Sequence, residues 1–139
     1  MMPRDLVCVA CAFSLFACTV TASAAGPSET ASRQFAKSLP NLPGKSLVAV
    51  IVDYAPGAAS RPHVHAKSAF IYAYVLSGAV ETQLDAEPLR VVRAGESFYE
   101  APGAHQVVSR NASGTEPARL LAIFVVDSAE SHELTSSDR

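Results

Sequence analysis

The stretch Phe70-Ile-Tyr-Ala-Tyr-Val-Leu-Ser-Gly-Ala-Val-Glu-Thr-Gln-Leu84 contains two segments with the residue pattern of β-strands, separated by a glycine. In the first segment, Phe70 to Leu76, aromatic and aliphatic residues follow one another. In the second, Ala79 to Leu84, Glu81 and Gln83 alternate with Val80, Thr82 and Leu84. Successive side chains of a strand point to opposite faces, so this alternation indicates one buried and one solvated face. The stretch predicts two strands joined by a tight turn at Gly78.

Segments of the same kind occur on both sides of this stretch. They are Leu47–Tyr54, Leu89–Arg93, Ser97–Glu100, His105–Ser109 and Leu120–Val126, separated by Gly-, Pro- and Asn-containing turns. Strand signals that recur about every 8–12 residues favour an all-β sandwich or barrel. A double-sheet jelly roll is one of the few such architectures open to a chain of 139 residues. We expect one β-barrel domain over residues 46–127.

The segments that flank this domain have different patterns. Residues 25–45 are expected to form a short helix or an irregular linker, because Phe35 and Leu39 make an i, i+4 apolar pair within Ser28–Leu39. Pro40 and Pro43, with Gly44, would end that helix and form a linker. The C-terminal tail, residues 128–139, is polar and is expected to fray.

The first 24 residues have the organisation of a secretory signal peptide. Arg4 precedes the nearly uncharged apolar run Leu6–Val20, and Ala22-Ser-Ala24 follows with the small residues of a cleavage site. We expect cleavage near Ala24 and a secreted or periplasmic protein. Two alternatives remain, namely an uncleaved anchor helix and a lipoprotein modified at Cys18.

Cleavage near Ala24 would leave 115 of the 139 residues and remove all three cysteines, which lie at positions 8, 11 and 18. The mature chain would carry ten Lys and Arg against twelve Asp and Glu, because the first 24 residues hold one basic and one acidic residue. Without a basic cluster, nucleic acid is not expected as a partner. No second apolar run approaches the length of a membrane span.

Three of the four histidines lie in two short stretches. His63 and His65 are two residues apart, so on a strand both imidazoles point to one face, roughly 6.5–7 Å apart. His105 follows 40 residues later and joins them only if the fold unites distant strands. Three neutral imidazoles would leave open positions on a metal ion, as in catalytic sites. Imidazole suits Zn, Cu, Fe or Ni.

With these stretches in view, the chain resembles a small single-domain cupin. The first cupin motif, G(X)5HXH(X)3–4E(X)6G, is matched by Gly57, His63, His65 and Gly78. The second, G(X)5PXG(X)2H(X)3N, is matched with shifted spacings by Gly95, Pro102, Gly103, His105 and Asn111. The resemblance implies a jelly-roll barrel and a divalent metal ion such as Fe, Mn, Ni or Zn held by His63, His65 and His105. It also implies that some relatives use the same cavity without a metal.

One departure from the cupin pattern concerns its glutamate ligand. That residue should fall within Ala69–Ile71, yet no acidic residue occurs between His65 and Gly78. Glu100 lies two residues before Pro102 on the second motif. We interpret Glu100 as a candidate fourth ligand or acid/base group; the alternative is a solvated strand residue.

Two function classes follow from these patterns. One is a metal-dependent enzyme, dioxygenase-, isomerase- or lyase-like, acting on a small molecule. The other is a non-catalytic module that binds a small ligand or a metal, as a sensor or store. Arg61 and Gln106 flank the histidines and are either anion-orienting or solvated. A homodimer formed through the apolar strand Leu47–Val52 is also expected, although burial in the core would explain that strand equally well.

Overall fold

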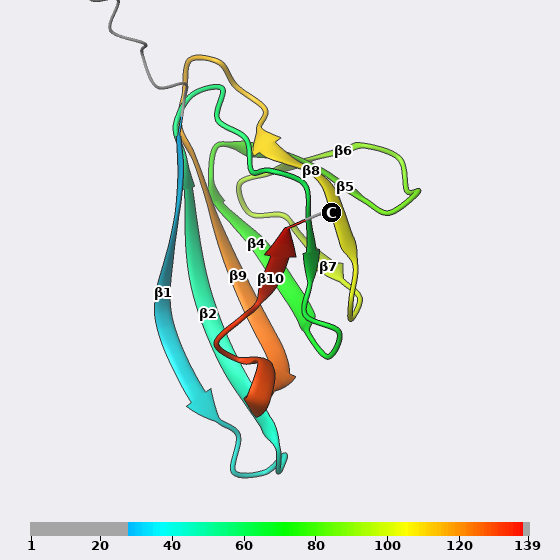
Figure 1. Ribbon diagram of the computed structural model, residues 1–139. Coiled ribbons are helices and arrows are strands. Elements are labelled where there is room, and N and C mark those ends of the chain that lie inside the picture. Colours follow the sequence, from blue (N-terminus) through cyan, green and yellow to red (C-terminus); the bar gives the residue numbers. More distant parts are fainter. Residues whose placement is uncertain (1–27, 138–139) are drawn as a thin grey trace, which may run out of the picture.

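The computed structural model describes residues 28–137, and these are almost entirely β-structure (Figure 1). Ten strands and one short 3-10 helix make up the described chain. In order they are β1 (Glu29–Ser38), β2 (Lys45–Tyr54), β3 (His63–His65), β4 (Phe70–Ser77), β5 (Ala79–Leu84), β6 (Arg90–Arg93), β7 (Ser97–Glu100), β8 (His105–Asn111), β9 (Ala118–Asp127), η1 (Ser128–Glu130) and β10 (Thr135–Ser137).

The strands form two five-stranded sheets. The first sheet has the order β1-β2-β9-β4-β7 and the second the order β10-β3-β8-β5-β6, with every pairing antiparallel. Strands far apart in the sequence therefore lie side by side, as β2 and β9 do over ten residue pairs. The all-β jelly-roll prediction is confirmed, and the predicted strands Ala79–Leu84 and Ser97–Glu100 have the observed bounds.

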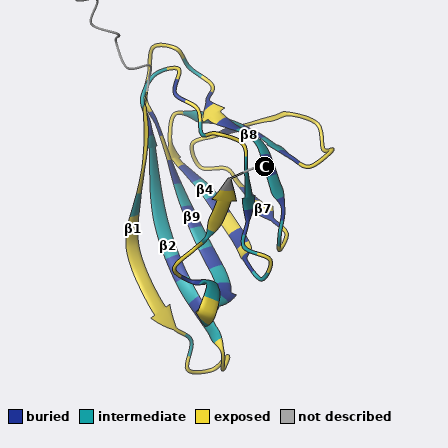
Figure 2. Ribbon diagram, viewed as in Figure 1, coloured by how far each residue is buried: buried dark blue, intermediate teal, exposed yellow. Residues whose placement is uncertain are grey.

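The core lies between the two sheets and consists of two apolar clusters of buried residues; buried positions are dark blue in Figure 2. One is centred on Val75 and Val80, and the other on Val48 and Ile71, all of them at most 1% exposed. The predicted turn at Gly78 joins β4 to β5 with φ +70°, a backbone conformation that costs L-residues energy. A Cβ atom at this position would lie 2.6 Å from the carbonyl oxygen of Pro117, so only glycine fits.

The predicted helix over Ser28–Leu39 is wrong, because Glu29–Ser38 is the strand β1. It pairs with β2 along its whole length, with a bulge between Arg33 and Phe35. The i, i+4 pair that suggested a helix is worth only about 0.2–0.5 kcal/mol. A free edge of the ten-residue strand β2 instead offers a full ladder of backbone hydrogen bonds, and this tertiary pairing decides the conformation.

The C-terminal tail was also predicted wrongly over its described part. β10 pairs with β3, and the Arg33 guanidinium donates a hydrogen bond to the Ser131 carbonyl at 2.9 Å. The Glu130 carboxylate accepts hydrogen bonds from the backbone amide and hydroxyl of Ser68. Polar composition suggested fraying, but these polar groups tie the tail to both sheets.

The predicted signal peptide and the lipidation candidate Cys18 lie outside the described residues. Among residues 28–137, no helix is long and apolar enough to cross a membrane.

Candidate metal and ligand site

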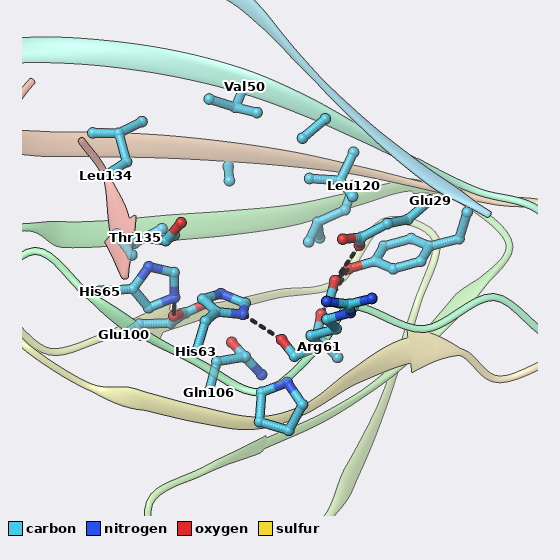
Figure 3. Close-up of a pocket in the computed structure, with 18 of the residues that line it drawn as sticks. Glu29, Val50, Arg61, His63, His65, Glu100, Gln106, Leu120, Leu134 and Thr135 are labelled. Carbon is cyan, nitrogen blue, oxygen red and sulfur yellow. Dashed lines mark hydrogen bonds and ion pairs between the residues drawn. The ribbon is translucent and has the colours of Figure 1, made fainter. Parts of the chain in front are cut away.

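A cavity of about 820 Å³ lies between the two sheets. Its main apolar wall comes from β2, β9 and β4, and its polar side chains come from β1, the end of β2, β3, β7, β8 and the loop before β3 (Figure 3). The apolar side chains of β2, β4 and β9 are Val50, Val52, Ile71, Leu120, Ala122 and Phe124. The polar ones include Tyr54, Ser60, Arg61, His63, His65, Glu100, Gln106 and Ser109.

His63 and His65 both line this cavity from β3, whereas Val64 between them does not. Their ring centroids are 4.8 Å apart and the rings are nearly perpendicular, at 86°. His63 Nδ1 lies 2.8 Å from the Arg61 carbonyl oxygen and therefore donates to it. That hydrogen bond makes Nε2 the basic nitrogen of His63. The two-residue spacing thus places both imidazoles on the cavity side of one strand.

Glu100 enters the cavity from β7 in the opposite sheet. Its Oε2 lies 2.6 Å from His65 Nε2, and each side chain is 6% exposed (Figure 3). The contact lacks the direction of a hydrogen bond, and His65 Nδ1 and Nε2 and Glu100 Oε2 are all buried without a hydrogen-bond partner. Such atoms carry a large desolvation penalty, which a bound cation would remove. The interpretation of Glu100 as a solvated residue is wrong.

His105 does not lie with the other two histidines. The β3–β8 register pairs His105 with Val64 and Gln106 with His63. Paired residues share a sheet face, so His105 points away from the cavity while Gln106 lines it. Gln106 is 3% exposed, and its amide donates to Thr82 Oγ1 at 3.0 Å. The expected three-histidine set is therefore not assembled in this structure, and the interpretation of Gln106 as solvated is wrong.

Within the part of the chain that the structure describes, no three His, Cys, Asp or Glu side chains are already arranged as a ligand set. The case for a metal ion therefore depends on His65 and Glu100, whose buried nitrogen and oxygen atoms have no hydrogen-bond partner. The ring of His63 lies next to that of His65. Imidazole and carboxylate together suit Zn, Fe or Mn.

The other end of the cavity holds a hydroxyl network that the sequence did not suggest. The Tyr54 hydroxyl lies 2.7 Å from Ser109 Oγ and 3.1 Å from Ser60 Oγ, and Ser60 donates to the Glu29 carboxylate. Burial raises the pKa of Tyr54 above its ordinary value, and the charges of Glu29 and Glu100 add to this effect. Tyr54 therefore remains a neutral phenol at neutral pH.

Three residues of the C-terminal tail also line the cavity: Leu134, Thr135 and Ser136. β10 carries two of them beside β3, so the tail forms part of the wall near His65. A polar tail without strand periodicity gave no signal for this placement. Arg61 lines the cavity and is exposed.

The two-sheet fold and its inter-sheet site define a double-stranded β-helix protein of the jelly-roll type. Residues 50–124 match the family model described as "Cupin domain". The match covers more than half of the chain, and the protein belongs to the cupin family.

Among proteins of known sequence, the chain is similar to the cupin-domain-containing oxidoreductase fogC of Aspergillus ruber. The two are 30% identical over 78 residues, which is 56% of this chain but only 37% of fogC. The chain therefore spans little more than a third of that relative.

Among solved structures, the chain is similar to an uncharacterized conserved protein with a double-stranded β-helix domain from Klebsiella pneumoniae. The TM-score is 0.59 at 20% identity, covering 73% of this chain and 79% of that one. It is also similar to recombinant oxalate oxidase in complex with glycolate, with a TM-score of 0.56 at 23% identity, covering 73% of this chain and 52% of that one. At these identities the likeness concerns the fold alone.

Proposed function

We propose that this cupin binds a divalent metal ion in the inter-sheet cavity through His63, His65 and Glu100, and acts there on a small molecule. The observation that carries the proposal is the buried His65–Glu100 contact. Its nitrogen and oxygen atoms lie 2.6 Å apart without a hydrogen bond of their own. Two such groups on opposite sheets are stabilised together by one cation, because it satisfies both at once.

A set of three protein ligands leaves positions on the metal for water or substrate. When bound, the metal would supply a Lewis acid that polarises an oxygen of the substrate. The chain itself supplies the rest of the site. The apolar wall of β2, β9 and β4 excludes water from the substrate, and the Gln106 amide lies on the cavity side next to His63. The neutral Tyr54 hydroxyl is a hydrogen-bond donor at the far end.

An enzymatic role is supported by the sequence similarity to one oxidoreductase. The second candidate is a non-catalytic ligand-binding module. It is favoured by the largely apolar cavity wall and by the amide of Gln106, which cannot transfer a proton at neutral pH. Screening of metal-loaded protein against small hydroxy acids, carboxylic acids and phenols separates the two candidates. Turnover that is lost in His65→Ala supports the enzyme.

The metal site itself is tested by equilibrium dialysis of metal-free protein against Zn²⁺, Mn²⁺ and Fe²⁺. His65→Gln should weaken binding at least about 10–100-fold, since even an outer-shell partner is worth that much. His105→Gln is the matched control and should leave the affinity unchanged, because His105 does not line the cavity. Equal losses in the two variants would restore the three-histidine set and reject the one proposed.

We also propose that the chain is exported with residues 1–24 removed. The support is the sequence pattern that ends at Ala24. N-terminal sequencing of the protein recovered from the periplasm or medium tests this, and an intact Met1 would contradict it.

A further inference from the structure

The hydroxyl network lies at the end of the cavity away from His65 and runs from the surface to the interior. It connects Glu29 on β1 through Ser60 and Tyr54 to Ser109 on β8, and Figure 3 shows Glu29 at the opposite end of the cavity from His65. Glu29 is exposed and Ser60 is half-buried, whereas Tyr54 and Ser109 are 2% and 7% exposed. All four residues line the cavity, so the network joins solvent to a buried hydroxyl inside it.

The carboxylate of Glu29 determines the direction of each hydrogen bond in this network. A carboxylate only accepts, so the single proton of the Ser60 hydroxyl is donated to Glu29. The 3.1 Å contact between Tyr54 and Ser60 then requires the proton of Tyr54, which makes Ser60 the acceptor. For the same reason Ser109 donates to Tyr54 across their 2.7 Å contact. Each hydroxyl therefore donates toward Glu29, and the proton of Tyr54 is directed at Ser60 and not at the cavity.

Ser109 is the last member of the network, and its oxygen keeps acceptor capacity that the network does not use. A hydroxyl oxygen has two lone pairs, yet within residues 28–137 the hydrogen bond to Tyr54 is the one that this side chain makes. Its proton is committed to Tyr54, so Ser109 can only accept from a molecule in the cavity. A buried acceptor of this kind is complementary to a hydroxyl or N–H group, and a carbonyl or ether oxygen would leave it without a partner.

A bulge in β8 turns Ser109 toward the cavity. The register of β8 against β5 makes Val107 an extra residue on β8. Gln106 and Ser109 therefore line the same cavity although they are three residues apart, a spacing that places side chains on opposite faces of a regular strand. Gln106 pairs with His63, so Ser109 lies roughly 10 Å further along β8 than the level of His63.

We propose that the hydroxyl network selects ligands with a hydrogen-bond donor, a hydroxyl or N–H group, at the end opposite to their metal-binding oxygen. This inference rests on the proposed function, because the metal site at His63, His65 and Glu100 holds the other end. The apolar wall of β2, β4 and β9 between the two ends accommodates an apolar body. A span of roughly 10 Å suits one ring with substituents at opposite ends, together with a metal–oxygen bond of about 2 Å and a hydrogen bond of about 2.7 Å. The ligand class is a small hydroxy- or amino-substituted acid with an apolar body.

Two basic residues also line the cavity, but they do not make its far end an anion site. Arg33 and Arg61 are both exposed, so water and salt screen their charges, and the Arg33 guanidinium donates to the Ser131 carbonyl. The effect of Glu29 does not depend on a long-range field, because it acts through the positions of the protons. A second carboxylate on the ligand would meet the accepting oxygen of Ser109 and gain no hydrogen bond from it.

The test is isothermal titration calorimetry of the Zn²⁺-loaded protein with four 4-substituted benzoates at neutral pH. 4-Hydroxybenzoate and 4-aminobenzoate carry a donor at the far end, whereas 4-fluorobenzoate and 4-methylbenzoate have a similar shape and no donor. The wild type should bind the first pair about 3–10-fold more tightly, which is the range that one hydrogen bond between neutral groups supplies. All four probes share the ring and the carboxylate, so this ratio of affinities depends on the far end alone.

Two variants test whether the network is the source of the preference. Ser109→Ala removes the accepting oxygen and should bring the ratio close to one. Glu29 is a positioning residue: Glu29→Ala frees the proton of Ser60, so the hydroxyls can reverse their direction and the ratio should again approach one. Glu116→Ala is the matched control and should keep the wild-type ratio, because Glu116 is exposed and does not line the cavity. A merely structural effect would weaken all four probes alike and leave the ratio unchanged.

A wild-type ratio near one would overturn the inference, as would a ratio that survives Ser109→Ala or Glu29→Ala. Circular dichroism establishes that the variants are folded, and Glu29→Ala at the surface remains informative if Ser109→Ala is not. Metal binding is measured separately by dialysis. If Zn²⁺ binds but the wild type binds no probe at millimolar concentration, the donor preference fails and the metal site stands. If the ratio persists without Zn²⁺ and in His65→Gln, the metal site fails and the donor preference stands.

Discussion

Replacement of Glu100 by glutamine distinguishes the contribution of this residue to metal binding from its contribution to folding stability. Glu100 is 5% exposed, and its carboxylate contacts His65 across the two sheets. Glutamine has the same size and keeps one oxygen, but it removes the negative charge that would hold a cation. The metal-free Glu100→Gln protein should therefore unfold within about 1 kcal/mol of the wild type, since a neutral amide of the same size fills the buried position without the desolvation cost of a charge.

The effect on the metal-bound protein should be much larger. A dication and a unit negative charge 4 Å apart interact by about 8 kcal/mol at an effective dielectric constant of 20, and desolvation offsets most of this. If about 2.7 kcal/mol of the attraction remains after desolvation, the loss of the carboxylate charge weakens metal binding 100-fold. Metal at 100 times the wild-type dissociation constant stabilises the wild type by about 2.7 kcal/mol, but stabilises a variant with 100-fold weaker binding by only about 0.4 kcal/mol.

The assay is thermal unfolding with and without metal. For a domain of this size, 1 kcal/mol shifts the melting temperature by about 4 °C. The metal should raise the melting temperature of the wild type by about 11 °C and that of Glu100→Gln by about 2 °C at the same concentration. Glu116→Gln is the control, because Glu116 is exposed and does not line the cavity. An equal metal-induced rise in wild type and Glu100→Gln would refute the assignment of Glu100 as a ligand.

Two further predictions concern the fold. Burial raises the pKa of Tyr54 above 10, so its contribution to stability is fully present below pH 10 and is lost as the pH rises through the raised value. The free energy of unfolding of Tyr54→Phe, measured in urea, should therefore fall less steeply above pH 10, and a slope equal to the wild type's would contradict this. Gly78→Ala should lower the free energy of unfolding by more than the cost of a left-handed backbone in an L-residue, which is about 1–2 kcal/mol. The added Cβ would also lie 2.6 Å from the Pro117 carbonyl oxygen. Gly44→Ala, at φ +80° in open space, should cost only that conformational penalty, and equal losses would show that Pro117 moves aside.

Most of the β-structure could be predicted from the sequence because strands with one buried and one exposed face alternate apolar and polar residues. Ala79–Leu84 buries its even-numbered residues and leaves its odd ones half-buried, as its pattern indicated. The turn at Gly78 could also be predicted, because few residues other than glycine adopt the positive φ that it requires. These signals are local, and each strand carries its own.

The strand β1 and the tail could not be predicted in this way, because their conformations depend on partners. β1 is exposed along nearly its whole length and carries no burial pattern. Its structure comes from the ladder with β2, and that of β10 from the ladder with β3. An edge strand without an apolar face has no periodicity for the sequence to reveal.

Motif spacing predicted the direction of two of the three histidines, but not that of the third. His63 and His65 lie two apart within one strand, so their common direction follows from local geometry and both face the cavity. The direction of His105 depends on the register of β8 against β3, which the sequence does not give. A shift of that register by one residue turns each side chain to the opposite face. The observed register gives the cavity position to Gln106. Glu100 faces the same cavity from the other sheet and occupies the place of an acidic partner for His65. A chain that lacks the acidic residue of the first cupin motif can thus bring one to the same histidine from a strand 35 residues away, because the sandwich sets β7 opposite β3.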